Sequence, residues 1–88
     1  MSHFKIEIRA AALKSLEGLE KKEKLRIYAA IELLGDNPQP PLAVKIKGSS
    51  YFRVRVGDYR ILYSIDSGRL IILIIEIGHR REIYRLVN

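Results

Sequence analysis

A two-residue turn, Gly57-Asp58, constrains the fold more strongly than any other feature of the sequence. It separates two segments that alternate between apolar and polar residues, Tyr-Phe-Arg-Val-Arg-Val at 51–56 and Tyr-Arg-Ile-Leu-Tyr at 59–63. Glycine followed by a polar residue suits a type II′ turn, which joins two antiparallel strands directly. The sequence therefore predicts a tight β-hairpin whose register is set by this turn.

Alternation along this hairpin sorts its side chains onto two faces. One face carries Arg53, Arg55 and Arg60, and the turn places Arg55 directly opposite Arg60. The other face is apolar and pairs Val56 with Tyr59, Val54 with Ile61, and Phe52 with Tyr63. Like charges opposite one another destabilise a sheet, so we expect an anion to bind between these guanidinium groups. The planar fork of arginine matches phosphate oxygens, which favours an oligophosphate.

The charge of the chain also favours an anionic partner. Its 88 residues are enough for one domain, and the formal net charge is +6. Residues 1–36 hold seven Lys and Arg against six Asp and Glu, whereas residues 37–88 hold nine against four. This asymmetry favours a polyanionic partner, with nucleic acid first and an acidic protein second, although solubility alone is an alternative reading.

Several classes of function are disfavoured. The chain has no cysteine, which excludes disulfide, thiolate and zinc-thiolate chemistry. The N-terminal residues begin a strand-like alternation and do not form a signal peptide. The longest apolar run, Leu70–Ile75, is too short to span a bilayer. We therefore expect a soluble cytoplasmic protein with no membrane partner.

The periodicity predicts an α+β two-layer sandwich, with a helical hairpin on one face of a sheet and the arginines on the other. The predicted last strand is apolar on both sides and should be central in the sheet, and the last three strands should form a meander. The length of the loop before that strand stays open between two and three residues. In chain order we expect a strand at 4–8, helices at 10–19 and 21–34 with Gly35 as a cap, and a proline-rich connector at 36–41. A transition segment at 42–50 then leads to strands at 51–56 and 59–65, a turn at 66–68, and a strand at 69–77 that Gly78 ends.

The order of strand, helical hairpin and basic meander, followed by Gly-His-Arg-Arg-Glu-Ile-Tyr at 78–84, resembles the RelE/ParE superfamily of toxins. The resemblance covers nearly the whole chain, 1–88. It implies either of two activities. Members of the RelE branch cut messenger RNA in the ribosomal decoding site, without a metal or other cofactor, through attack by the RNA 2′-hydroxyl. Members of the ParE branch poison DNA gyrase. In both branches a cognate antitoxin neutralises the toxin.

The resemblance also assigns roles to single residues. Arg53 and Arg55 match two basic residues before the hairpin turn, and Arg60 matches the arginine after it. Arg80 matches the arginine after the central strand, and Tyr84 matches the C-terminal tyrosine. The chain departs from the family in using Arg-x-Arg where some relatives use lysine. It also has Pro40-Pro41 where some branches carry a glutamate base.

Acid–base roles are left open between two residues. On the resemblance Tyr84 is the base, and His79 is an alternative acid because its imidazole titrates near neutrality. Tyr84 could instead be a packing residue and His79 a turn residue. Contacts that confer RNA affinity are expected from Lys45, Lys47, Tyr51 and Arg81.

Three functions therefore remain: an RNA-cleaving toxin that acts on messenger RNA at the ribosome, with contacts to ribosomal RNA; a gyrase poison; and a basic RNA-binding module without catalysis. The arginine set favours the first. An alternative without a binding role is a solvent-exposed sheet face on which the arginines pair with Glu76 or Glu82.

Overall fold

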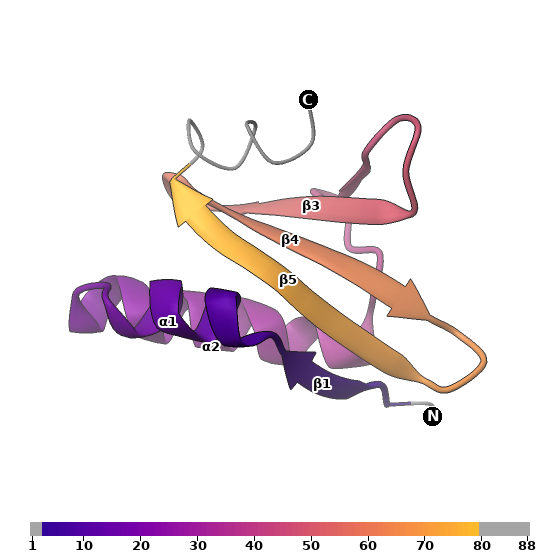
Figure 1. The fold of residues 1–88 in the computed structure, drawn as a ribbon, viewed down its shortest axis with the longest axis horizontal. Helices are drawn as coiled ribbons and strands as arrows, with labels where there is room; N and C mark the ends of the chain where they lie inside the picture. Colours follow the sequence, from indigo (N-terminus) through magenta and orange to yellow (C-terminus); the bar gives the residue numbers. More distant parts are fainter. Residues whose placement is uncertain (1–2, 80–88) are drawn as a thin grey trace.

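The structure, a computed structural model, describes residues 3–79. It contains two helices and five strands in this part of the chain, so the predicted α+β class is confirmed. Figure 1 shows β3, β4, β5 and β1 following one another from top to bottom, with both helices at the lower left. The elements are β1 (Lys5–Ile8), α1 (Ala10–Glu17), α2 (Lys21–Asp36), β2 (Val44–Lys45), β3 (Tyr51–Val56), β4 (Tyr59–Asp66) and β5 (Ile71–His79).

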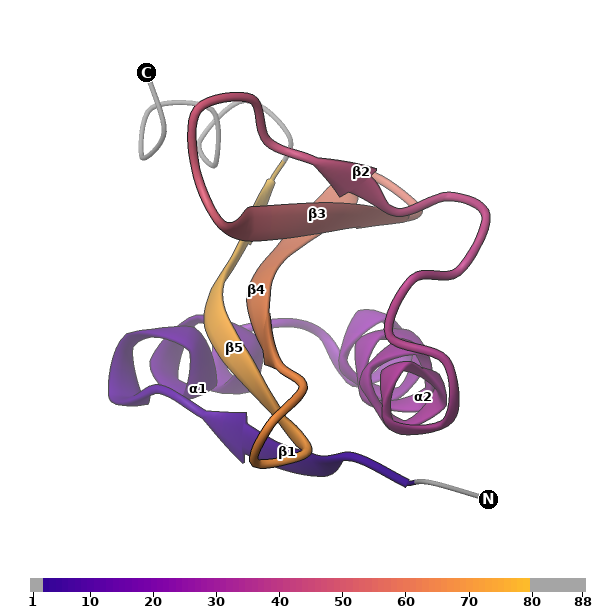
Figure 2. The same cartoon turned by 90° about the vertical axis from the view of Figure 1, so that its right-hand side faces the viewer.

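The strands form one mixed sheet in the order β1-β5-β4-β3-β2. The pairs β2–β3, β3–β4 and β4–β5 are antiparallel, whereas β1 runs parallel to β5. The predicted meander and the internal position of β5 are both confirmed. The helical hairpin of α1 and α2 carries the chain from the β1 edge of the sheet to the β2 edge (Figure 2). The meander then leads back from β2 to β5, which pairs with β1 in the parallel direction.

The core lies between the helices and one face of the sheet. Ala12 and Leu16 of α1 are fully buried, as the helical spacing predicts, and in β1 the isoleucines are half-buried while the charged residues between them are exposed. The buried core cluster consists of Ala12, Leu16, Ile27, Ile31, Leu34, Val54, Ile61, Tyr63, Ile72, Ile74 and Ile77.

The hairpin has the predicted register at every pair, including Arg55 opposite Arg60 and Val54 opposite Ile61. Gly57 has a φ of +61°, and Leu70 is the one non-glycine residue with positive φ within residues 3–79. A positive φ at the first central residue alone is the signature of a type II′ turn. The turn and the local alternation therefore account for the register of this part of the sheet.

Four expectations about the elements were wrong. The two-residue strand β2, within the transition segment, was missed, so the sheet has five strands and not four. The turn after β4 has four residues, because Asp66 pairs with Ile71. Gly78 does not end β5: it pairs with Arg60, and the strand continues to His79.

Gly35 was expected to cap α2, and this fourth expectation was also wrong. It lies inside the last turn of the helix and is buried. A Cβ atom there would come within 2.9 Å of the His3 ring and 3.1 Å of the Phe4 carbonyl oxygen. The backbone amide of Phe4 donates to the Gly35 carbonyl at 2.8 Å. Glycine is therefore required for the close approach of α2 to the start of β1.

Candidate nucleic-acid interface

Three arginines meet on the sheet face that is turned away from the core. Arg53, Arg55 and Arg60 line one pocket of about 180 Å³ together with Leu42 and Val44. These five residues are called the arginine pocket below. Three arginines around a small hollow supply the positive charge and the planar donors that a phosphodiester would require.

The backbone of the hairpin holds the arginines in place. Arg55 donates from Nε to the carbonyl oxygen of Gly57 at 3.1 Å, which draws this exposed side chain toward the turn. Arg60 is half-buried and lies opposite Gly78 on β5. Glycine has no side chain, so β5 contributes none beside Arg60 at this position of the sheet.

The carboxylate of Glu76, which could have paired with the arginines, is engaged elsewhere. Its Oε1 accepts a hydrogen bond from the Ser15 hydroxyl at 3.0 Å and another from the backbone amide of Ile77 at 2.9 Å. Glu76 thereby ties α1 to β5 at the part of β5 beyond its pairing with β1. The other carboxylate considered, Glu82, lies outside the described residues.

Tyr51 lies on the same face as the arginines, as expected, because it alternates with Arg53 along β3. It is half-buried and lines a second hollow of about 290 Å³ with Arg9, Leu62 and Glu76, among others. Leu62 is only 2% exposed and pairs with Arg53, so it adds an apolar side chain to the lining of this second hollow.

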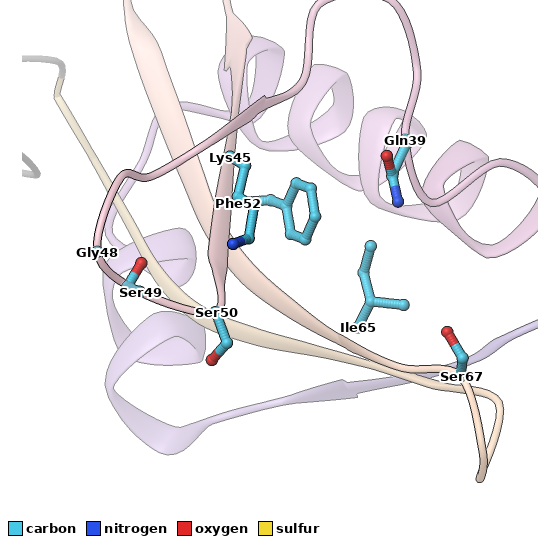
Figure 3. Close-up of a pocket in the computed structure, with 8 residues that line it drawn as sticks. All are labelled: Gln39, Lys45, Gly48, Ser49, Ser50, Phe52, Ile65 and Ser67. Carbon is cyan, nitrogen blue, oxygen red and sulfur yellow. The ribbon is translucent and has the colours of Figure 1, made fainter.

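Lys45 and His79 are placed on the opposite face of the sheet. Lys45 pairs with Phe52 and lines a hollow of about 700 Å³ (Figure 3). His79 pairs with Tyr59, and their rings meet edge-on with centroids 6.0 Å apart. The structure therefore does not bring these two residues together with the arginines. Lys47 is exposed in the turn between β2 and β3.

Arg80, Arg81 and Tyr84 lie outside the described residues, and their assignments remain predictions. Within residues 3–79 no three His, Asp or Glu side chains are grouped so that they could hold a metal ion. No helix in that range has the length and apolar character needed to cross a membrane.

Tyr63 is the one described residue whose ionisation is strongly perturbed. Burial raises the pKa of its phenol to about 12. The hydroxyl donates to the Pro38 carbonyl oxygen at 2.6 Å, and the ring stacks on Phe52 with centroids 5.7 Å apart. Tyr63 points into the core and anchors the proline-rich connector, so its role is structural.

Comparison with known proteins bears on this arrangement of hairpin, sheet and arginine pocket. The sequence model described as the ParE toxin of the type II toxin-antitoxin system parDE matches residues 6–84. The chain belongs to the ParE toxin family. The predicted membership of the RelE/ParE superfamily is thereby confirmed.

Individual relatives of this ParE-family chain carry RelE names. It is 33% identical over 86 residues to the RelE1 protein of Methanocaldococcus jannaschii, covering 93% of this chain and 96% of the relative. It is 36% identical over 66 residues to toxin RelG of Mycobacterium tuberculosis, covering 68% and 76%. A crystal structure of the archaeal RelE-RelB complex from Pyrococcus horikoshii superimposes with a TM-score of 0.80 at 26% identity, covering 89% and 96%.

Sequence reasoning missed three residues of this ParE-family chain that border the arginine pocket or the turn. Leu42 and Val44 were left in a transition segment, although the alternation Val-Lys-Ile-Lys at 44–47 indicates a short edge strand. Arg26 of α2 lies against the hairpin turn, with its guanidinium nitrogens 3.3 Å from where a Cβ of Gly57 would be. Only the tertiary fold could reveal that contact.

Proposed function

We propose that the chain is the toxin of a type II toxin–antitoxin system and that it cleaves messenger RNA on the ribosome. The observation that carries this proposal is the arginine pocket, where Arg53, Arg55 and Arg60 line one hollow on the same face of the sheet. The RelE names of the relatives and the chain's basic charge support the same activity.

The proposed reaction is attack of an RNA 2′-hydroxyl on the adjacent phosphodiester. It requires a base for the hydroxyl proton, an acid for the departing 5′-oxygen, and cations that stabilise the charge of the phosphorane. Arg53, Arg55 and Arg60 supply the cations, and Arg80 is proposed to join them. The protein groups carry this charge themselves, so the proposed mechanism needs no cofactor.

Tyr84 is proposed as the base. The acid stays open between His79 and another group, because the His79 ring contacts Tyr59 on the helix side of the sheet. Lys47, Tyr51 and Arg81 are proposed to track the RNA strand, and Tyr51 is favoured as a stacking surface because it lies beside Arg53 on the same face. Lys45, on the other face, would contact RNA only if the strand passes around β2.

The proposed partners are messenger RNA, with ribosomal RNA around it, and a cognate antitoxin. The Pyrococcus horikoshii RelE was crystallised as a complex with RelB, which supports a protein of that class as the antitoxin here. Translation takes place in the cytoplasm, which is therefore the proposed site of action.

A second function, inhibition of DNA gyrase, is favoured by the ParE sequence model that matches residues 6–84. The two functions are separated by one experiment. The chain is added to a coupled transcription and translation extract, where messenger breaks are mapped by primer extension and gyrase-dependent supercoiling of a plasmid is measured in parallel. Codon-aligned RNA breaks with intact DNA support the nuclease. DNA breaks or lost supercoiling with intact RNA support gyrase inhibition, and RNA binding without cleavage supports a non-catalytic module.

A further inference from the structure

The wall of the arginine pocket is apolar, although it stands in water. Leu42 is 68% exposed and Val44 is 48% exposed. Val44 pairs with Arg53, so the two side chains leave the sheet on the same face. Leu42 and Val44, called the apolar wall below, therefore stand directly beside the guanidinium groups.

The backbone presents this wall in a fixed position. Pro40 and Pro41 have restricted φ angles, and the Ala43 amide donates to the Pro40 carbonyl oxygen at 2.9 Å. This turn holds Leu42, and the pairing of β2 with β3 holds Val44. A wall that is ordered before binding loses little conformational entropy when a ligand covers it.

We infer that the apolar wall seats the nucleobase next to the phosphate bound in the arginine pocket. The inference rests on the proposed function, because it takes the anion to be an RNA phosphodiester. A nucleotide has a charged end and a flat apolar face only a ribose apart. The arginine pocket offers the same two chemistries side by side, with three cations on one side and two aliphatic side chains on the other.

Other ligands match the pocket less well. A free phosphate or sulfate ion would leave Leu42 and Val44 in water. An apolar peptide would match the wall but would present no anionic group to the three arginines that line the same hollow. A base over the wall removes apolar area from water on both partners, and this contribution does not depend on the phosphate contacts.

The test compares two short RNAs that carry the same phosphates. Both are 2′-O-methylated so that they cannot be cut, and one has an abasic site in place of a single base. We expect the wild-type chain to bind the intact RNA about fivefold more tightly than the abasic RNA, as partial burial of two aliphatic side chains predicts. Leu42→Ser should remove that preference, because it replaces the apolar contact with a hydroxyl.

A matched control is available on α2. Leu33 is 67% exposed, almost the same as Leu42, but it lies on α2 and does not line the arginine pocket. Leu33→Ser should retain the full preference for the intact RNA. Because both leucines are largely in water, both variants should unfold at nearly the wild-type denaturant concentration.

Equal binding of the two RNAs by the wild-type chain, or binding of neither, would overturn the inference. So would a Leu42→Ser variant that keeps the preference while losing affinity for the antitoxin, because the wall would then belong to a protein interface. The same preparations are assayed for messenger cleavage in a translating extract. If the wild-type chain cleaves messenger RNA but binds both RNAs equally, the inference is wrong and the proposed function is unaffected. If it prefers the intact RNA but cleaves no messenger RNA, the proposed nuclease function is wrong.

Discussion

Arg55 lies directly opposite Arg60 across β3 and β4, so two guanidinium groups leave adjacent strands on the same face. Opposed like charges cost a sheet roughly 0.2–1 kcal/mol relative to neutral pairs. The hairpin tolerates this cost because its other face is held by core residues such as Val54 and Ile61. An anion placed between the two arginines would convert the repulsion into attraction.

This arrangement predicts that oligophosphates stabilise the folded chain. Pyrophosphate should raise the thermal midpoint of the wild-type protein, because a ligand that binds only the native state adds to its stability. The increase should be smaller in Arg55→Gln, which removes one of the opposed charges. The measurement is differential scanning fluorimetry at low ionic strength, where charge contacts are least screened.

The matched control for that experiment is Arg69→Gln. Arg69 is exposed in the turn between β4 and β5, at the end of β4 away from the hairpin turn. Its substitution by glutamine removes the same charge from the protein as Arg55→Gln does. It should leave the response to pyrophosphate nearly unchanged. An equal loss in both variants would mean that net charge, and not the arginine pocket, determines the response.

Arg60→Ala should reduce messenger cleavage about 10²–10³-fold, the usual loss when one donor to a transition-state oxyanion is removed. Its fold should persist, since Arg60 projects from the sheet face opposite the core cluster. Cleavage is followed by primer extension, and folding by circular dichroism, with Arg69→Ala as the control. A folded Arg60→Ala protein that cuts at the wild-type rate would show that the site has been placed wrongly.

Local patterns were sufficient to predict the hairpin, because a two-residue turn and strict alternation fix each cross-strand pair. They were not sufficient at Gly35 and Gly78. A glycine after a helical stripe or after a strand ordinarily ends the element. Here Gly35 is required by the approach of Phe4, and Gly78 lies across from Arg60, so in both cases the reason is a residue distant in sequence.

The same distinction applies to the candidate site. The arginine face could be predicted because its members lie on one hairpin. The position of Lys45 on the helix side could not, because β2 has only two residues and its register depends on pairing with β3. The apolar wall was missed for the same reason, since the side to which Val44 points follows from that pairing.

Tyr63→Phe should lower the free energy of unfolding by about 1–2 kcal/mol at neutral pH, because the Pro38 carbonyl loses its 2.6 Å hydrogen bond. The stacking on Phe52 should remain. Urea unfolding of the two proteins measures this difference. No loss in the variant would indicate that water replaces the phenol at the carbonyl.

The same residue predicts a loss of stability in alkali. The pKa of Tyr63 in the folded chain is about 12, above the ordinary value of 10.0, so the folded state favours the protonated phenol. This contribution is fully present below pH 10 and is lost as the pH rises from 10 to 12. Tyr63→Phe lacks the titrating group and should lose less stability over that interval. Parallel unfolding curves for both proteins across the interval would contradict the expectation.

Gly57→Ala should destabilise the chain by about 1–2 kcal/mol, because alanine is strained at the φ of +61° that the turn requires. A Cβ atom there would also come within 3.3 Å of the Arg26 guanidinium group. The Arg26 side chain is 51% exposed, and its ion pair with Glu23 is long at 3.6 Å, so it can move aside at little cost. Backbone strain should therefore dominate.

Two comparisons separate strain from contact at this turn. Gly48→Ala tests strain alone, because Gly48 has a φ of +81° and no atom within 4 Å of its Cβ position. It should cost nearly as much as Gly57→Ala. Adding Arg26→Ala to Gly57→Ala should recover less than about 0.5 kcal/mol, in line with an exposed ion pair. Recovery of most of the lost stability would show that the Arg26 contact, and not the left-handed backbone, makes glycine necessary here.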